Sequence, residues 1–257
     1  MSKTIIVSNR LPVKITEKDG EYVLNPSEGG LATGLGSIYR QGYNIWIGWP
    51  GVDVNEAAQG QIKQQLGTMN LMPVYLTQDE INNYYEGFSN EVLWPVFHYM
   101  SVYARYEQVY WDYYYQVNTK FRDAVLEVAE PGDVIWIHDY QLLLLPGMIR
   151  AAAPDVAIGY FQHIPFPSFE LFRLIPWRVE LLEGMLGADL LGFHTFDDSH
   201  HFLNAVTRLL PLNANANVVT VNDRAVVAET FPMGIDNNKF ELLSQDPEVI
   251  KQVESLR

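Results

Sequence analysis

The sequence predicts an α/β fold in which helices cover a doubly wound, mostly parallel β-sheet. Short apolar runs alternate along the chain with longer stretches of helical periodicity, as strand–helix–strand units require. Several of the short runs are apolar at nearly every position, which is typical of parallel strands buried on both faces. Together these two observations favour an open sheet with helices on both sides.

The predicted strands are short runs rich in β-branched and aromatic residues. They are Thr4–Ser8, Ile45–Gly48, Met72–Leu76, Val134–His138, Ala157–Gln162, Leu190–Phe193 and Ala225–Phe231. The segment Pro211–Asn222 has the weakest pattern, and we expect it to include a surface loop.

The stretches that join these strands show helical patterns. The longest ends where Pro131 and Gly132 interrupt it. The predicted helices are Leu31–Arg40, Glu56–Leu66, Tyr106–Ala129, Leu142–Ala153, Val179–Leu186, Asp197–Leu210 and Asp246–Leu256.

Composition excludes several classes of function. With 17 Lys and Arg against 31 Asp and Glu, the 257-residue chain has a net charge of −14, which disfavours nucleic acids and anionic membranes. A small anionic ligand is still compatible, because a few cations in a pocket act at short range. The absence of cysteine excludes disulfides and thiolate chemistry. No signal peptide and no apolar run of about 18–20 residues is present, so we expect a cytoplasmic protein.

The candidate functional residues follow from the fold class. Ligands of open α/β sheets bind beyond the carboxyl ends of the strands, so residues at or just past each strand end are the ones to consider. These are Asn9, Arg10, Trp49, His138, Asp139, His163 and His194.

Three of the candidate features allow both a functional and a structural interpretation. Arg10 offers a fork of donors that suits a phosphate, or a surface salt bridge. Gly29 and Gly30 precede a predicted helix and would let a diphosphate approach its N-terminus, or form an ordinary turn. Asp139 can cap the following helix or accept hydrogen bonds from a sugar hydroxyl.

His163 is followed by Pro165 and Pro167, which stiffen the loop after it. A ring held in this way suits a donor aimed at a hydroxyl or a developing charge, whereas most buried histidines are satisfied core residues. The stretch Tyr84–Tyr99 mixes aromatic and polar residues and predicts either a sugar pocket or a pair of core helices. Trp111–Asn118 predicts a packed helix face. No spacing typical of metal ligands is present, and no metal site is predicted.

Eight motifs in order carry a resemblance to a known family. They are SNRLP, GGLATGL, WIGWPG, YYEGFSNEVLWPVFHY, VIWIHDYQLLLLP, GYFQHIPFPSFELFR, LLGFHT and FPMGID, and they span nearly the whole chain. Together they resemble the trehalose-6-phosphate synthases, glycosyltransferase family 20, which are retaining enzymes with two Rossmann-like domains (the GT-B fold). The resemblance implies that residues 1–235 form the N-terminal, acceptor-side domain and that residues 236–257 begin the connection to a donor-binding domain.

The resemblance also implies a reaction. The family transfers glucose from UDP-glucose to glucose-6-phosphate with retention of configuration, giving α,α-trehalose 6-phosphate and UDP. No cofactor or essential metal is expected. The implied partners are the two substrates and the C-terminal GT-B domain of the same protein, and the exposed interdomain surface suggests self-association.

Residue roles are implied by the matching motifs. Arg10 would hold the acceptor phosphate, and Tyr85 and Trp94 would form the acceptor pocket. Asp139 and His163 would be the catalytic residues. Asp139, with Gln141, would bind sugar hydroxyls, and His163 would touch the transferred glucose. Some family members carry His at the position of Gln141. Gly29 and Gly30 would belong to the loop that closes over the donor diphosphate.

One departure from the family limits what the 257 residues are expected to do. The RLDYxKG-type motif of the second domain, whose Arg and Lys hold the donor diphosphate, does not occur in this sequence. We therefore expect an acceptor-binding half with little or no turnover by itself. Two alternatives stay open. One is a GT-B transferase or UDP-sugar epimerase that acts on other sugars, and the other is a non-catalytic sugar-phosphate-binding or regulatory module.

Overall fold

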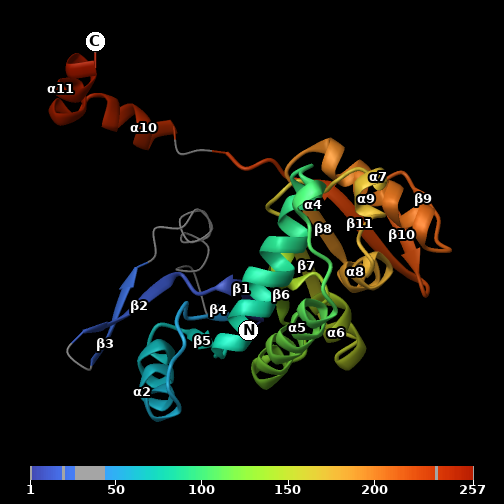
Figure 1. The fold of residues 1–257 in the computed structure, drawn as a ribbon, viewed down its shortest axis with the longest axis horizontal. Coiled ribbons are helices and arrows are strands. Elements are labelled where there is room, and N and C mark those ends of the chain that lie inside the picture. Colours follow the sequence, from blue (N-terminus) through green and yellow to red (C-terminus); the bar gives the residue numbers. More distant parts are fainter. Residues whose placement is uncertain (1, 19–20, 27–43, 235–236, 257) are drawn as a thin grey trace.

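A computed structural model describes residues 2–18, 21–26, 44–234 and 237–256 of the chain (Figure 1). In this part a nine-stranded sheet has the order β5-β4-β1-β6-β7-β8-β11-β10-β9, and a two-stranded sheet pairs β2 with β3. The strands from β5 to β11 pair in parallel, whereas β10 pairs antiparallel with both β11 and β9. The predicted α/β architecture with a mostly parallel sheet is confirmed.

The parallel strands match the predicted ones to within a few residues. They are β1 (Thr4–Arg10), β4 (Ile45–Trp49), β5 (Leu71–Pro73), β6 (Val134–His138), β7 (Ala157–Phe161), β8 (Leu190–Phe193) and β11 (Arg224–Thr230). The extension of the third predicted strand to Leu76 is wrong. The Val74 amide still donates to the carbonyl oxygen of Gly48 in β4 at 2.9 Å, whereas Leu76 lies beyond the strand and is buried in the larger core, so its apolar character reflects packing.

The stretch Pro211–Asn222 includes the predicted surface loop, an exposed turn at Ala216, but it also contains two strands that were not predicted, β9 (Ala214–Asn215) and β10 (Val218–Val221). Val221 pairs with Arg224, so Asn222 and Asp223 form a two-residue hairpin loop, and both have positive φ angles, 48° and 63°. Asn and Asp favour such turns, which was the local signal for a hairpin. The hairpin of β2 (Val13–Lys18) and β3 (Glu21–Pro26) was likewise not predicted.

Six of the seven predicted helices lie within the described residues and are confirmed as α-helices to within a few residues. The structure adds shorter helices that were not predicted. The α-helices are α2 (Glu56–Gly67), α3 (Gln78–Glu80), α4 (Trp94–Phe97), α5 (Gln108–Val128), α6 (Leu145–Ala152), α7 (Phe169–Phe172), α8 (Arg178–Met185), α9 (Phe196–Leu209), α10 (Asn237–Ser244) and α11 (Pro247–Leu256). A π-helix, η1 (Ile81–Leu93), and two 3₁₀ turns, η2 (Ser101–Tyr103) and η3 (Tyr140–Leu142), complete the set. The predicted helix Leu31–Arg40 lies outside the described residues.

Side chains that alternate along the strands separate two cores. Ile5 and Val7 of β1 point into the larger core with residues of α5, α6, α8 and α9, whereas Ile6 points into a smaller core with Trp46 and residues of α2. This alternation follows from the two-residue period of a strand. Both faces of β1 are therefore covered, and its carboxyl end is where polar groups emerge.

Helices α10 and α11 lie apart from the sheet (Figure 1). They carry exposed apolar side chains, among them Phe240, Leu242, Ile250 and Leu256. Among the described helices, none combines the length and the apolar composition that crossing a bilayer requires.

Three glycines allow α6 and α8 to approach each other closely. A Cβ at Gly187 would overlap the backbone of Pro146 and Gly147, and one at Gly184 would lie 2.6 Å from the carbonyl oxygen of Leu143. Backbone atoms cannot move away as a flexible side chain can. The absence of a side chain at these positions therefore sets the distance between the two helices.

We expect Gly187→Ala to lower the free energy of unfolding by about 1–3 kcal/mol, because an added methyl group in a close-packed contact forces the backbone to shift. Urea denaturation followed by circular dichroism measures the change. Gly60→Ala is the matched control. Gly60 lies within α2 with no atom within 4 Å of an added Cβ, so this substitution should stabilise the chain by about 0.5–1 kcal/mol. Equal effects of the two substitutions would contradict the assigned contact.

Candidate active site at the carboxyl edge of the sheet

The parallel pairing of neighbouring strands brings the polar strand-end residues to one edge. β6 pairs with β1 on one side and β7 on the other, and β7 pairs with β8. Arg10, Asp139, His163 and His194 end or follow these four strands. The structure thus places these predicted site residues at a single edge, where open α/β sheets bind ligands.

The Arg10 guanidinium lies over aromatic rings rather than beside a carboxylate. Its Cζ atom is 4.5 Å from the centroid of the Trp49 ring and 5.6 Å from that of Tyr85. Gly51, with φ of 90°, lies below it, and a Cβ there would be 3.3 Å from Nη1. Among the ion pairs of the described residues, none involves Arg10. Stacking holds this exposed cation in place while its donors stay available.

The stretch Tyr84–Tyr99 forms helices that pack in the core, as one of its two interpretations predicted, and the sugar pocket stays a prediction. Its buried side, including Tyr84 and Phe88, packs in the larger core. Its other side carries Tyr85 and Trp94 towards the candidate site. The Trp94 side chain is 41% exposed and its ring centroid lies 5.8 Å from that of Tyr140. The segment begins as the π-helix η1, and such helices occur frequently at functional sites.

Buried tyrosine hydroxyls fix the ends of the strands. The Tyr84 hydroxyl donates to Asn9 Oδ1 at 3.0 Å. The Tyr114 hydroxyl donates to the carbonyl oxygen of Tyr140 at 2.7 Å and accepts from the Leu143 amide at 3.0 Å. The packed helix face predicted at Trp111–Asn118 is confirmed and contains Tyr114, but sequence reasoning assigned no hydrogen-bonding role to Tyr84 or Tyr114. Neither follows a strand directly, so only the three-dimensional packing reveals their contribution.

Asp139 caps η3 and also ties two strand ends together. Its Oδ1 accepts from the amides of Tyr140 at 3.0 Å and His163 at 3.3 Å, and its own amide donates to the carbonyl of Phe161 at 2.8 Å. The residue adopts a positive φ of 76°. Burial raises the pKa of its carboxyl to about 6, although the two backbone donors oppose the rise. Among the described residues no hydrogen bond to Oδ2 is formed, so this oxygen is available to a ligand.

The remaining predicted site residues are less informative. Gln141 lies in η3 and its side chain is 8% exposed, while its carbonyl oxygen accepts from Asn118 at 3.1 Å. Gly29 and Gly30 lie outside the described residues. Within the described part of the chain, no group of three or more His, Asp or Glu side chains is arranged to hold a metal ion.

Three histidines lie next to one another at the carboxyl ends of β6, β7 and β8. His138 Nδ1 and His163 Nε2 are 2.9 Å apart, and the ring centroids of His163 and His194 are 5.6 Å apart. Burial and, to a smaller extent, the nearby His194 lower the pKa of His163 to about 4. Burial, with His163 next, holds the pKa of His138 well below its ordinary value. Both imidazoles of the hydrogen-bonded pair are therefore neutral at pH 7.

The loop after His163 is held by side chains from distant segments. Asp198 of α9 accepts from the Phe166 amide at 2.9 Å, and the Tyr99 hydroxyl accepts from the Ser168 amide at 3.1 Å. His201 Nδ1 lies 3.1 Å from the carbonyl oxygen of Phe166. The prolines Pro165 and Pro167 thus act together with a hydrogen-bonded frame that the sequence did not reveal.

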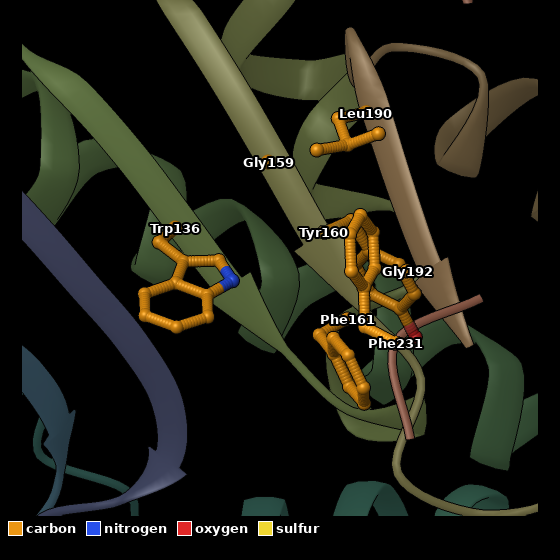
Figure 2. Close-up of a pocket in the computed structure, with 7 residues that line it drawn as sticks. All are labelled: Trp136, Gly159, Tyr160, Phe161, Leu190, Gly192 and Phe231. Carbon is orange, nitrogen blue, oxygen red and sulfur yellow. The ribbon is translucent and has the colours of Figure 1, made fainter. Parts of the chain in front are cut away.

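An apolar pocket of 320 Å³ lies on the sheet surface, and Figure 2 shows the residues that line it. Gly159 and Gly192 leave room on the sheet surface, and Trp136 and Phe161 form part of the wall. The ring of Trp136 is 4.6 Å from that of His138, and the ring of Phe161 is 4.7 Å from that of His163. These apolar neighbours contribute to the desolvation that keeps both imidazoles neutral.

With the geometry of the edge established, comparison with known proteins identifies the family. The family model of glycosyltransferase family 20 matches residues 2–257. The chain belongs to glycosyltransferase family 20. The predicted family membership is confirmed, and with it the general class of glycosyltransferases.

Individual relatives show the same assignment. A bifunctional trehalose-6-phosphate synthase/phosphatase from Thermoproteus tenax is 44% identical over 99% of this chain. An E. coli structure described as trehalose-6-phosphate bound with UDP-2-fluoro glucose superposes with a TM-score of 0.82 at 31% identity over 99% of the chain. A Burkholderia xenovorans α,α-trehalose-phosphate synthase (UDP-forming) in complex with glucose-6-phosphate gives a TM-score of 0.80 at 26% identity, also over 99%. The chain spans 36%, 54% and 56% of these three proteins, respectively.

The raised pKa of Asp139 has a consequence for stability. The folded chain keeps a proton on this carboxyl at pH values where the unfolded chain, with an ordinary pKa of about 3.9, has lost it. The contribution of Asp139 to stability therefore falls as the pH rises from about 4 to about 6 and stays low above that range.

We expect the stability of Asp139→Asn relative to the wild type to be lower at pH 4 than at pH 7 by about 1–2 kcal/mol, a figure discounted for the partial exposure of the side chain. Asparagine cannot ionise but keeps the Oδ1 acceptor for both amides. Urea denaturation at the two pH values measures the difference, and Asp155→Asn, an exposed carboxylate, controls for the loss of one charge. A relative stability that does not change with pH would show that Asp139 titrates normally.

Proposed function

We propose that this edge binds glucose-6-phosphate as the acceptor in a glucosyl transfer from UDP-glucose that gives α,α-trehalose 6-phosphate with retention. The observation that carries the proposal is the placement of Arg10. It is an exposed cation without an ion pair among the described residues, it is stacked on Trp49 and near Tyr85, and it shares one sheet edge with Asp139 and His163. The relatives named above supply the identity of the sugars.

The acceptor side follows from the chemistry of these groups. A guanidinium fork binds a phosphate through charge-assisted hydrogen bonds, which are stronger than neutral ones. Exposed aromatic side chains such as Trp94 suit the apolar face of a sugar ring. Acidic residues elsewhere on the chain oppose an anionic ligand at Arg10 only weakly, because salt screens the repulsion between charges more than about 10 Å apart. Arg10 would therefore bind the phosphate while Tyr85 and Trp94 enclose the sugar.

Asp139 and His163 would act on the sugars rather than on the phosphate. The free Oδ2 of Asp139 would accept a sugar hydroxyl, and the neutral His163 ring would contact the transferred glucose. In the reaction, the acceptor hydroxyl oxygen would form a bond to the anomeric carbon as the bond from that carbon to the UDP oxygen breaks on the same face, and the hydroxyl proton would pass to the departing phosphate oxygen of UDP. Holding both sugars in register would supply much of the rate.

The 257 residues would supply only the acceptor side of this reaction. In this proposal residues 1–235 form the acceptor domain, and residues 236–257 begin the connection to a donor-binding domain. Two observations support this division. The chain spans 36–56% of the relatives named above, and α10 and α11 expose apolar side chains away from the sheet. Because these 257 residues contain no RLDYxKG-type motif to hold the diphosphate, they would turn over little or not at all by themselves.

A non-catalytic sugar-phosphate-binding or regulatory module is the second candidate. Such a module would bind the sugar phosphate with the same groups, Arg10 stacked on Trp49 and near Tyr85, without a transfer step. A GT-B transferase or epimerase for other sugars is disfavoured by Arg10, whose placement fits a phosphorylated acceptor.

We expect glucose-6-phosphate to bind the chain and Arg10→Ala to weaken this binding about 10- to 100-fold, because a hydrogen bond to a charged group contributes about 1.5–3 kcal/mol. Calorimetric titration measures the dissociation constants. Arg122→Ala is the matched control, since it removes a partly exposed arginine on α5 and should leave binding unchanged. Glucose should bind the wild type more weakly than glucose-6-phosphate.

Two results would contradict the proposed acceptor site. Tighter binding of glucose than of glucose-6-phosphate would favour a transferase for other sugars. Equal binding of glucose-6-phosphate by the wild type and Arg10→Ala would place the phosphate elsewhere on the chain.

A further inference from the structure

The hydrogen-bonded histidine pair carries an inference beyond the roles described above. His138 is the last residue of β6 and is fully buried, while His163 follows β7, the neighbouring strand. Their contact joins Nδ1 of His138 to Nε2 of His163 at 2.9 Å. The other ring nitrogen of His138, Nε2, is buried and has no hydrogen-bond partner among the described residues.

A hydrogen bond between two neutral imidazoles couples their tautomers. Only one proton can lie between the two nitrogens, and each neutral ring carries one N–H. If His138 donates from Nδ1, then His163 must carry its proton on Nδ1. If His163 donates from Nε2, then His138 must carry its proton on the buried Nε2. The proton position on His138 therefore decides whether His163 Nδ1 is a donor or an acceptor.

The surroundings of His138 favour one of the two arrangements. Its Nε2 faces no acceptor in the described structure, and the neighbouring side chain on β6 that contacts its ring is Trp136. Buried N–H groups without an acceptor are rarer in proteins than buried acceptors without a donor. The proton of His138 is therefore expected on Nδ1, where the partner ring accepts it.

We infer that His138 is a positioning residue that fixes His163 in the tautomer with its proton on Nδ1, so that His163 presents an N–H donor at its partly exposed edge. This inference deepens the proposed function, on which the role of that donor rests. In that setting the donor would serve an oxygen of the transferred sugar, and the bond from His138 would hold the ring plane in place.

The test is nitrogen NMR of the chain labelled with ¹⁵N-histidine, recorded without ligand at pH 7. The chain contains six histidines, so the spectrum is simple enough to assign by substitution. Long-range proton–nitrogen correlations distinguish protonated from bare ring nitrogens. The expected result is a single tautomer for both rings, protonated on Nδ1 and bare on Nε2. A proton on Nε2 of His163, or a mixture of tautomers, would overturn the inference.

Two substitutions separate positioning from mere packing. His138→Asn places an amide donor near the position of the Nδ1 proton and should preserve the tautomer of His163. His138→Phe fills the space without a donor and should convert His163 to a mixture. His200→Asn, on the exposed side of α9, is the control and should leave the His163 signals unchanged. A single unchanged tautomer in folded His138→Phe would contradict the inference. If this variant does not fold, the wild-type spectrum still decides the tautomer.

The outcome is independent of the acceptor-binding proposal. The spectra need no substrate, so failure of glucose-6-phosphate to bind leaves the tautomer result unaffected. Conversely, a wrong tautomer would remove the positioning role of His138 while leaving Arg10 and its acceptor site in place.

Discussion

The candidate site depends on the parallel pairing of β6 with β1 and with β7. This pairing brings the ends of three strands together. It allows the Asp139 amide to donate to the carbonyl oxygen of Phe161, while the Asp139 carboxylate accepts from the backbone amide of His163. Each strand is apolar until its last residues, so the polar groups emerge only at the edge. On the face that α5, α6, α8 and α9 cover, the strand side chains are buried up to that point, and the residues of the site begin where this cover ends.

Desolvation at this edge acts on acid and base in opposite directions. It raises the pKa of Asp139 to about 6 and lowers that of His163 to about 4. Near pH 7 the result is an ionised carboxylate beside a neutral imidazole. As the pH falls from about 6.5 to about 4, the unfolded chain binds a proton at His163 that the folded chain resists, so the histidine lowers stability in the range where Asp139 raises it. The same desolvation keeps the His138 and His163 rings neutral, because Trp136 contacts the ring of His138 and Phe161 contacts that of His163.

Sequence reasoning located the parallel strands and most of the edge residues because both depend on local patterns. Continuous apolar runs identified β1, β6, β7 and β8, and the residues after them included Arg10, Asp139 and His163. It could not find the groups that hold these residues. Tyr84 and Tyr114 reach the edge from helices far along the chain, Asp198 fixes the loop after His163 from α9, and the contact of His138 with His163 joins residues 25 positions apart. The hairpin at Asn222 and Asp223 had a local signal, but weak flanking strands concealed it.

The most direct test of the account is UDP release from UDP-glucose by the 257-residue chain at high concentration, with and without glucose-6-phosphate. The central claim is that this chain builds an acceptor site but does not by itself hold the donor diphosphate. It predicts no acceptor-dependent release, together with a measurable affinity for glucose-6-phosphate. Release of UDP that depends on glucose-6-phosphate would contradict the claim and would show that the 257 residues, alone or as an oligomer, suffice for the transfer.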